Sequence, residues 1–229
     1  MFVGLEKLSL VDYDNKVSCI LFKQGCNFRC PFCHNSSLVT RLKENTEIPF
    51  EEILAYLRKR KGVLDAVVIS GGEPTLDLGL KDEIKKIKEI GYLIKLDTNG
   101  THPEVIKDLL ENNLLDYIAM DIKNSFEKYP STIGVDNYEK EKILQSIDLI
   151  INSKIDYEFR TTLIEEFHSL EDMNKIGEII KGAKKFYLQK FIDHETNIEQ
   201  GLRSVTKENA LIYKSVLSKY VESVELRGY

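Results

Sequence analysis

The sequence predicts an α/β fold in which a parallel sheet forms an open partial (β/α)6 barrel. Short apolar runs alternate along the chain with longer segments whose apolar residues recur at helical spacing. This alternation is typical of β-α-β units, which build a parallel sheet covered by helices. Six such units are too few to close an eight-unit barrel. The length of 229 residues suits a single domain that spans residues 1–229.

The chain opens with a lead-in, residues 1–16, in which we expect a small strand pair ending at a turn at Asp14 and Asn15. Seven apolar runs then predict strands at residues 17–22, 66–69, 92–96, 117–120, 157–163, 186–191 and 223–226. Amphipathic segments predict helices at about residues 50–60, 80–90, 103–110, 143–151, 170–181 and 207–219. Pro103 marks a helix start and Gly91 a helix end, while a polar segment runs up to Glu47.

The composition is that of a globular protein in a reducing compartment, and we expect the cytoplasm. Acids and bases are interspersed at a net charge of −5, which gives no broad footprint for nucleic-acid binding. Only four cysteines occur, so they are not a disulfide framework, and Cys19 within its apolar run is expected to be a buried structural thiol. Neither a signal peptide nor an apolar run of membrane-spanning length is visible, so we expect no membrane partner.

The other three cysteines share one loop, residues 24–36, which directly follows the first predicted strand. Cys26, Cys30 and Cys33 have the spacing C-x3-C-x2-C, close enough for three thiolates to meet at one metal centre. A [4Fe–4S] cluster is usually held by four cysteine thiolates. Three cysteines would therefore leave one iron open, which is a place to bind and break a substrate.

Three plainer interpretations compete with the iron–sulfur cluster. His34 could complete a structural zinc site, although the second pair of ligands typical of zinc knuckles is missing. Residues 30–34 also read C-x-x-C-H, the attachment pattern of c-type haem, but that leaves Cys26 unexplained. Unrelated core cysteines are the third alternative, which a loop containing Gly25, Asn27, Arg29 and Pro31 disfavours.

Polar clusters follow several of the other predicted strands at the points where those strands end. They are Gly71-Gly72-Glu73, Asp97-Thr98-Asn99-Gly100 and Asp121-Ile122-Lys123. Because the carboxyl ends of parallel strands meet on one side of the fold, these clusters and the cysteine loop should surround a common site. Each has a plainer interpretation as well: a tight turn for the glycines, an Asx turn after Asp97, and an ion pair between Asp121 and Lys123.

Across most of its length the chain resembles the radical S-adenosylmethionine (SAM) superfamily. The resemblance rests on CNFRCPFCHN, VISGGEPTL, LDTNG, YIAMDIK, FRTTL and LQKF, and it implies the open partial barrel, a [4Fe–4S] cluster and SAM. The chain is most similar to the short proteins that activate glycyl-radical enzymes. Phe32 before the last cysteine, and His34 and Asn35 after it, fit that group. No cysteines remain for auxiliary clusters.

The resemblance also implies roles for individual residues, beginning with Cys26, Cys30 and Cys33 as the ligands of the [4Fe–4S] cluster. It implies a possible monovalent cation held by Asp97, Thr98 and Asp121. The implied SAM-binding residues are Phe32, His34, Gly71, Gly72, Glu73, Asp97, Asn99, Asp121, Lys123, Arg160 and Gln189. For Arg160 the plainer alternative is a structural ion pair, either with Glu158 or with an acid on a neighbouring strand.

The function implied by the resemblance is reductive cleavage of SAM followed by hydrogen abstraction from a glycine of a partner enzyme. The expected partner is the anaerobic (class III) ribonucleoside-triphosphate reductase, with flavodoxin or ferredoxin as the one-electron donor. One alternative is the activation of another glycyl-radical enzyme, such as pyruvate formate-lyase. Another is a small-molecule reaction like that of 7-carboxy-7-deazaguanine synthase, and a zinc-binding regulatory module is a rival of a different class.

Overall fold

The structure, a computed structural model, describes residues 1–39 and 46–229 of the chain. Within these residues eight strands form one sheet whose spatial order follows the chain from β1 to β8. Strand β1 runs antiparallel to β2, and every later pair of neighbours is parallel. The strands are β1 Phe2–Ser9, β2 Ser18–Lys23, β3 Ala66–Gly71, β4 Leu93–Thr98, β5 Tyr117–Asp121, β6 Asp156–Leu163, β7 Lys185–Lys190 and β8 Ser223–Arg227.

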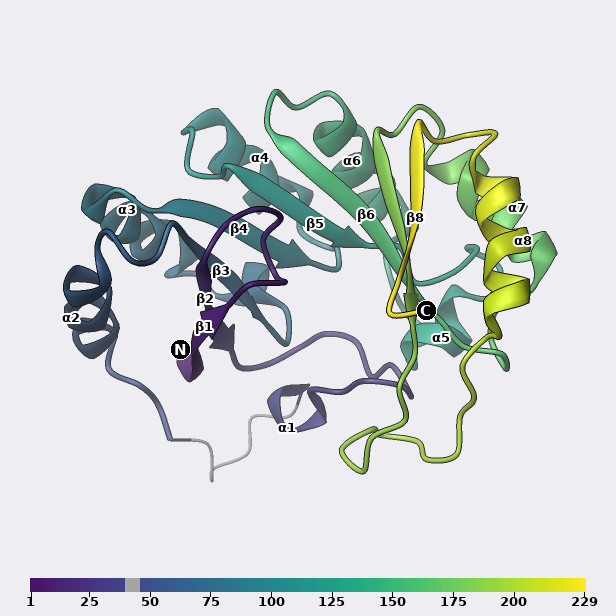
Figure 1. Ribbon diagram of the computed structural model, residues 1–229, viewed down its shortest axis with the longest axis horizontal. Coiled ribbons are helices and arrows are strands. Elements are labelled where there is room, and N and C mark those ends of the chain that lie inside the picture. Colours follow the sequence, from purple (N-terminus) through teal and green to yellow (C-terminus); the bar gives the residue numbers. More distant parts are fainter. Residues whose placement is uncertain (40–45) are drawn as a thin grey trace.

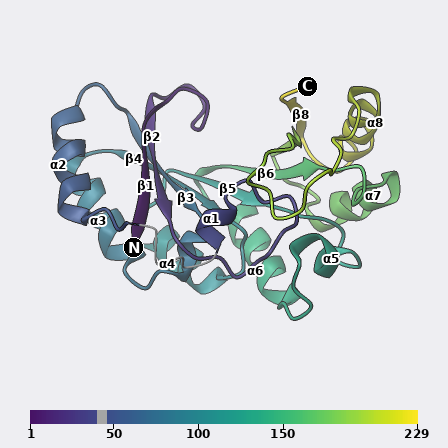
Figure 2. The same ribbon diagram turned by 90° about the horizontal axis from the view of Figure 1, so that it is seen from below.

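Helices cover the outer face of this sheet, as Figure 1 shows. Seen from below in Figure 2, the strands form an arc with β1 and β8 towards its two ends, so the barrel is open. The helices are α1 Ser36–Val39, α2 Phe50–Arg60, α3 Leu80–Ile90, α4 Pro103–Glu111, α5 Tyr129–Ile133, α6 Lys140–Ile151, α7 Leu170–Ile179 and α8 Lys207–Leu217, with a 3-10 turn at Pro74–Leu76.

Local sequence explains where these helices begin and end. In α3 the side chains of Leu80, Ile84 and Ile87 form one buried stripe against the sheet. The helix stops at Gly91, whose φ of 94° lies in the left-handed region that favours glycine. Helix α7 begins with a capping box, in which Ser169 and Asp172 satisfy each other's backbone N–H groups.

The predicted open barrel of parallel strands is confirmed, and most element boundaries shift by only one to three residues. The lead-in was predicted wrongly, because it contains one strand and not a pair. Strand β1 takes its partner from β2, with Leu5 opposite Leu21, so the antiparallel pair includes the first core strand. Of the polar segment predicted to run to Glu47, residues 36–39 form α1 and residues 40–45 lie outside the described residues.

The loop between β1 and β2, residues 10–17, packs on the inner face of the sheet near the amino-terminal ends of the parallel strands. Tyr13 packs with Ile20, Ala66, Val68 and Tyr117 in a small apolar cluster, separate from the main core between sheet and helices. On the other side of the loop, Asp12 O accepts a hydrogen bond from Lys95 at 2.7 Å and Asp14 pairs with Lys185 at 3.3 Å. The interior is therefore plugged at this end, and only the carboxyl ends of the strands are left to form a site.

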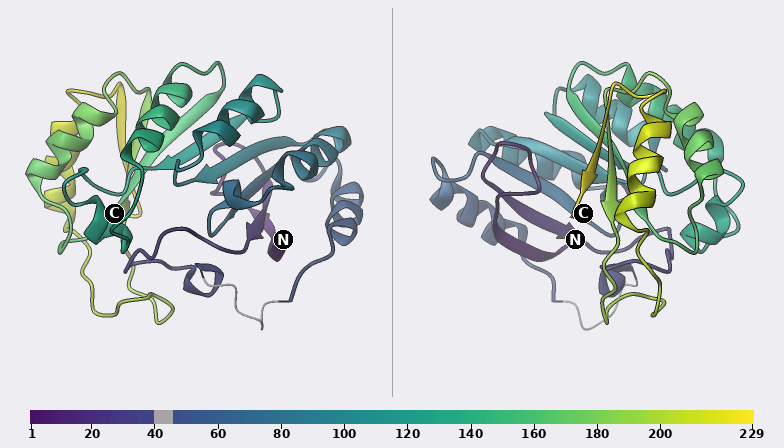
Figure 3. Two further views of the ribbon diagram at one scale, coloured as in Figure 1. Left: turned by 180° about the vertical axis from the view of Figure 1, so that it is seen from behind. Right: turned by 45° about the vertical axis from the view of Figure 1, so that its right-hand side comes forward.

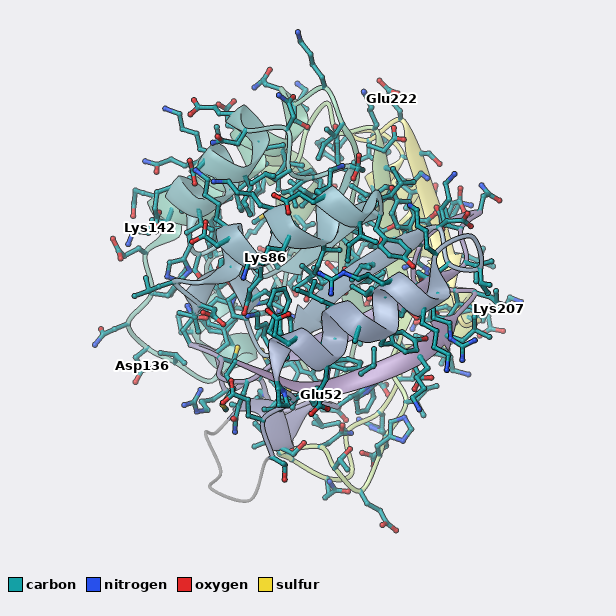
Figure 4. The ribbon with its side chains drawn as sticks, turned by 90° about the vertical axis from the view of Figure 1, so that its left-hand side faces the viewer. Glu52, Lys86, Asp136, Lys142, Lys207 and Glu222 are labelled. Atoms are coloured by element: carbon teal, nitrogen blue, oxygen red, sulfur yellow. The ribbon has the colours of Figure 1, made fainter. Side chains whose placement is uncertain are left out.

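Charged side chains extend from the outside of the molecule, as the labelled Asp136 and Glu222 do in Figure 4. Among the described residues, no helix is both long and apolar enough to cross a membrane.

Candidate active site

The carboxyl ends of the parallel strands surround one cavity of about 310 Å³. Every residue that the sequence predicted for a metal or cofactor site lines this cavity: Cys26, Cys30, Phe32, Cys33, His34, Gly71, Gly72, Glu73, Asp97, Thr98, Asn99, Asp121, Lys123, Arg160 and Gln189. Four further residues line it that the sequence did not predict: Phe28, Asn35, Ser70 and Thr162. Residues from six strand ends thus meet at one place.

Backbone hydrogen bonds hold the cysteine loop, residues 24–36, against four other segments: α1, the turn after β3, the end of α5 and the loop after β7. The bonds, with the N–H donor first, are Gly25 to Leu38 (2.7 Å), Glu73 to Gly25 (2.8 Å), Arg29 to Ile133 (2.8 Å) and Glu199 to Pro31 (2.8 Å). Both views of Figure 3 show this loop and the loop after β7 at the same end of the molecule. The cysteines are therefore placed by the surrounding strand ends as well as by their own short loop.

The three thiols line one wall of the cavity and are largely removed from solvent. Burial raises the pKa of Cys26 to about 12 and that of Cys30 to about 11, and it also raises the pKa of Cys33. The Lys123 ammonium opposes this shift at all three sulfurs. Thiolates bind metals, so a nearby cation favours the form that would act as a ligand. Among the described residues, no three His, Cys, Asp or Glu side chains are arranged to hold a single metal ion.

The two glycines after β3 are required by the cysteine loop. A Cβ atom at Gly72 would lie 2.1 Å from Gly25 O, and one at Gly71 would lie 2.2 Å from Lys23 O. Gly71 also has a φ of 124°, which other residues rarely adopt. The missing side chains therefore let the loop after β2 pack directly on the turn after β3, and the cavity wall is formed by backbone at this point.

Glu73 fixes this turn from the inside. Its carboxylate is buried and accepts hydrogen bonds from the Thr75 N–H and hydroxyl, from the Thr98 hydroxyl at 2.8 Å and from the Asn99 N–H at 2.6 Å. Burial raises the pKa of Glu73, and these donors oppose that shift because they stabilise the ionised carboxylate. The contacts of Glu73 that the structure shows therefore fix the turn.

A partly buried ion network lines the cavity as well. Arg160 donates through Nε to Asp121 at 2.5 Å, and its Nη2 lies 3.4 Å from Asp97. Lys123 pairs with the other oxygen of Asp121 at 2.7 Å. Burial alone would raise the pKa of Asp121, but Arg160 and Lys123 lower it to about 2. The predicted ion-pair alternative for Arg160 is therefore present. Arg160 pairs with Asp121 on the neighbouring strand β5 and with Asp97 on β4, and Glu158 lies 4.0 Å away.

One acceptor in this network has no partner. Asp97 Oδ1 is buried without a hydrogen bond, while Oδ2 accepts from Ser70 Oγ at 3.0 Å. A buried acceptor left unsatisfied is costly unless a ligand completes it. Three soft thiol donors and this acceptor line the same cavity, and they fit an iron–sulfur cluster next to an amine- or hydroxyl-bearing cofactor.

Of the predicted SAM-binding residues, His34 and Gln189 lie at the rim of the cavity, and the Asn99 side chain is hydrogen-bonded to other protein groups. His34 packs against Phe191 and His194, with its ring 4.9 Å from that of His194. Gln189 lies near the end of β7 and lines the cavity. The Asn99 side chain bonds to Asn27 and Thr101, so both of its polar ends have protein partners.

His168 is buried next to Lys123 of the ion network. Its Nδ1 accepts from the Ile164 N–H at 3.1 Å, so its Nε2–H donates to Lys123 O at 2.9 Å. Sequence reasoning also missed Ser70 and Thr162. Period-two spacing could have found Thr162, since it follows Arg160 by two residues and so shares its face of β6.

Comparison with known proteins identifies the class. The family model described as the Radical SAM superfamily matches residues 20–176, which is more than half of the chain. The chain therefore belongs to the radical SAM superfamily, whose enzymes carry a [4Fe–4S] cluster and use SAM.

Two relatives are more specific, and one solved structure shares the fold. A protein of Methanocaldococcus jannaschii, provisionally named a glycyl-radical enzyme activating enzyme, is 37% identical over 98% of this chain and 94% of its own length. The pyruvate formate-lyase-activating enzyme of Clostridium pasteurianum is 27% identical over 84% of this chain and 81% of its own. Streptococcus suis SuiB bound to SAM has the same fold, with a TM-score of 0.69 over 91% of this chain and 52% of its own at 13% identity.

Proposed function

We propose that this protein is the activating enzyme of a glycyl-radical enzyme, most specifically of an anaerobic ribonucleoside-triphosphate reductase. The observation that carries the proposal is the convergence of three cysteines, a glycine turn and a partly unsatisfied ion network on one cavity. The names of the two relatives support the activating role. The choice of reductase rests on the motifs described from the sequence.

In this proposal Cys26, Cys30 and Cys33 hold the [4Fe–4S] cluster and leave one iron for SAM. When bound, the cluster and SAM, with one electron from a flavodoxin or ferredoxin, would supply a 5′-deoxyadenosyl radical for hydrogen abstraction from the partner's glycine. The chain's own residues bind and orient: the backbone at Gly71 and Gly72 and the rim residues contact SAM, and no side chain has to act as a general base. Burial of the cavity wall keeps water from the reacting atoms.

The ion network would recognise the amino-acid end of SAM or its ribose. Asp97 Oδ1 has a free acceptor position for an ammonium or hydroxyl group, and Arg160 provides positive charge for a carboxylate. The same oxygen, together with Asp121, is the candidate ligand for a monovalent cation. Thr98 would contribute less, because its hydroxyl already donates to Glu73.

The size of the cavity favours a partner protein over a small-molecule substrate. At about 310 Å³ it is at the lower end of the range for sites that hold one drug-sized ligand. The cluster and SAM would share this space, so a second small molecule would have to fit beside them. A glycine carried on a segment of another protein could instead approach from the rim.

The test is an anaerobic reaction of reconstituted protein, reductant and SAM with the class III reductase of the same source. We expect a glycyl-radical signal in electron paramagnetic resonance (EPR), together with 5′-deoxyadenosine. Cys26→Ala should abolish both, since two cysteines cannot hold the site-open cluster, whereas Cys19→Ala, a buried cysteine outside the loop, should keep both.

The possible outcomes separate the alternatives. Deoxyadenosine without a glycyl radical would reject this partner and shift the proposal to another glycyl-radical enzyme or a small substrate. Neither product, from protein shown to contain an intact cluster, would contradict the proposed chemistry. One zinc per chain without sulfide would instead support the zinc-binding regulatory module.

A further inference from the structure

Among the described residues, the Asn27 side chain attaches the cysteine loop to the turn after β4, next to the first cysteine. Asn27 Nδ2 donates to Thr101 Oγ1 at 2.9 Å, and Asn27 Oδ1 accepts from Asn99 Nδ2 at 2.8 Å. Thr101 Oγ1 in turn donates to Asn99 Oδ1 at 2.7 Å. The three side chains form a closed ring of hydrogen bonds, in which each bond polarises the next.

The ring is sheltered from solvent, so its bonds are not easily replaced by water. Asn99 and Thr101 are both buried, and Asn27 is partly buried. Removing one member would leave buried polar atoms of the other two without partners, which costs more than the bond itself. The ring therefore favours one relative position of the cysteine loop and the turn after β4.

His102 joins this ring to the buried Glu73. Its Nδ1 lies 3.1 Å from Thr101 Oγ1 and 3.1 Å from Thr75 Oγ1. Both hydroxyls already donate, Thr101 to Asn99 and Thr75 to Glu73. Nδ1 must therefore carry the hydrogen and donate to the two hydroxyl oxygens. One continuous network thus connects the loop after β2 with the turns after β3 and β4.

From this network we infer that Asn27 is a positioning residue, which holds the Cys26 segment in register with the SAM-binding turns through Thr101 and Asn99. This inference rests on the proposed function, in which the cysteine loop holds the cluster and the turns after β3 and β4 bind SAM. It implies that the cysteine loop is already ordered before the cluster is inserted. Asn99 then acts on the loop through Asn27, in addition to any contact with SAM.

The first experiment uses the protein without its cluster and measures amide hydrogen exchange of residues 24–36. Thr101→Val keeps the shape of the side chain and removes the hydroxyl, whereas Thr101→Ser keeps the hydroxyl. We expect exchange in the loop to rise about tenfold in Thr101→Val and in Asn27→Ala, and to stay within about twofold of wild type in Thr101→Ser. Asn112→Ala, on the exposed end of α4, is the matched asparagine control.

A double variant tests whether Asn27 and Thr101 act as one unit. If the two side chains share a ring, the amide exchange rate of residues 24–36 in the double variant Asn27→Ala/Thr101→Val should lie within about threefold of the rate in either single variant. Effects that multiply to about a hundredfold, or equal exchange in Thr101→Val and Thr101→Ser, would overturn the inference. If Asn27→Ala fails to fold, the comparison of Val with Ser at position 101 still decides.

The reconstituted protein gives the second measurement. Cluster content should remain near four irons in Thr101→Val, while the dissociation constant for SAM, followed by the change in the EPR spectrum, rises about tenfold. An unchanged SAM affinity would contradict the positioning role. If the reconstituted wild-type protein did not cleave SAM, the proposed function would be contradicted, but the hydrogen-exchange result would still hold. Failure of the proposed function is therefore distinguishable from failure of the positioning inference.

Discussion

Two layers of charge lie inside the same partial barrel, and they differ in how completely their charges are paired. The lower layer is centred on Glu158, which accepts from Tyr117 OH at 2.9 Å and lies 3.2 Å from Arg227 and 3.7 Å from Lys95. Arg227 also stacks on the ring of Tyr187, 3.7 Å from its centre. Both oxygens of Glu158 have partners, and Arg160, two residues further along β6, lies 4.0 Å from Oε1 as well.

The upper layer is built on the same strands two residues later and is left incomplete. Asp97 follows Lys95 on β4, and Arg160 follows Glu158 on β6. Here Asp97 Oδ1 has no partner, and the layer faces the cavity. An ion network stabilises the fold where all its charged atoms are paired with one another. Where one acceptor is unpaired, the network can bind a ligand.

The largest effect is expected from breaking the closed layer. Glu158→Ala would leave Lys95 and Arg227 buried or half-buried without their carboxylate, so it should lower the free energy of unfolding by about 3–5 kcal/mol. Urea unfolding of the cluster-free protein measures this. Glu225→Ala, at an exposed position on β8, is the control, and a loss below about 1 kcal/mol in Glu158→Ala would contradict the closed layer.

Acid should weaken the upper layer through Asp121. Its pKa of about 2 in the folded protein lies below the ordinary value of 3.8, so its stabilisation is present above about pH 4 and is lost as the pH falls towards 2. Between pH 5 and pH 2.5 the wild type should lose about 2 kcal/mol more unfolding free energy than Asp121→Asn. Equal losses in the two proteins, measured by urea unfolding, would show that Asp121 is not held in the ionised form.

Asp97→Asn should separate ligand binding from stability. The amide keeps the shape of the side chain and a bond to Ser70, so we expect the unfolding free energy to change by less than about 1 kcal/mol. The dissociation constant for SAM should rise at least about tenfold, because the free carboxylate oxygen is lost. Titration of SAM into the reconstituted protein checks this, and unchanged affinity would place the ligand elsewhere.

The smallest effect is expected for an ion pair that belongs to neither layer. Lys107 and Glu111 on α4 lie 3.8 Å apart and are both mostly exposed. Glu111→Ala should change the unfolding free energy by less than about 0.5 kcal/mol, since exposed pairs of this kind contribute little. A change as large as that of Glu158→Ala would mean that burial does not account for the difference between the layers.

The sequence predicted the parts of the fold that depend on local pattern. The spacing of apolar residues and the positions of glycine and proline predicted the strands and helices. The rule that the carboxyl ends of parallel strands lie on one side of the fold predicted that the cysteines, Gly72, Asp97 and Asp121 meet. These features can be read from a single segment at a time, which is why they were found.

Features that depend on pairing between distant segments were missed. Lys95 and Glu158 look like isolated charges within strands, and only the register of β4, β5 and β6 shows that they meet. Nothing in the sequence near Asn27 indicates that Thr101 is its partner, 74 positions away. The single strand in the lead-in was missed for the same reason, because its partner is β2 and not another part of residues 1–16.

The measurement that tests the central claim most directly is metal analysis combined with EPR of the reduced protein, with and without SAM. The account predicts about four irons with sulfide per chain and a spectrum that changes when SAM binds, both lost in Cys26→Ala. A single zinc without sulfide, or a cluster whose spectrum is indifferent to SAM, would contradict the assignment of the cavity as a radical SAM site.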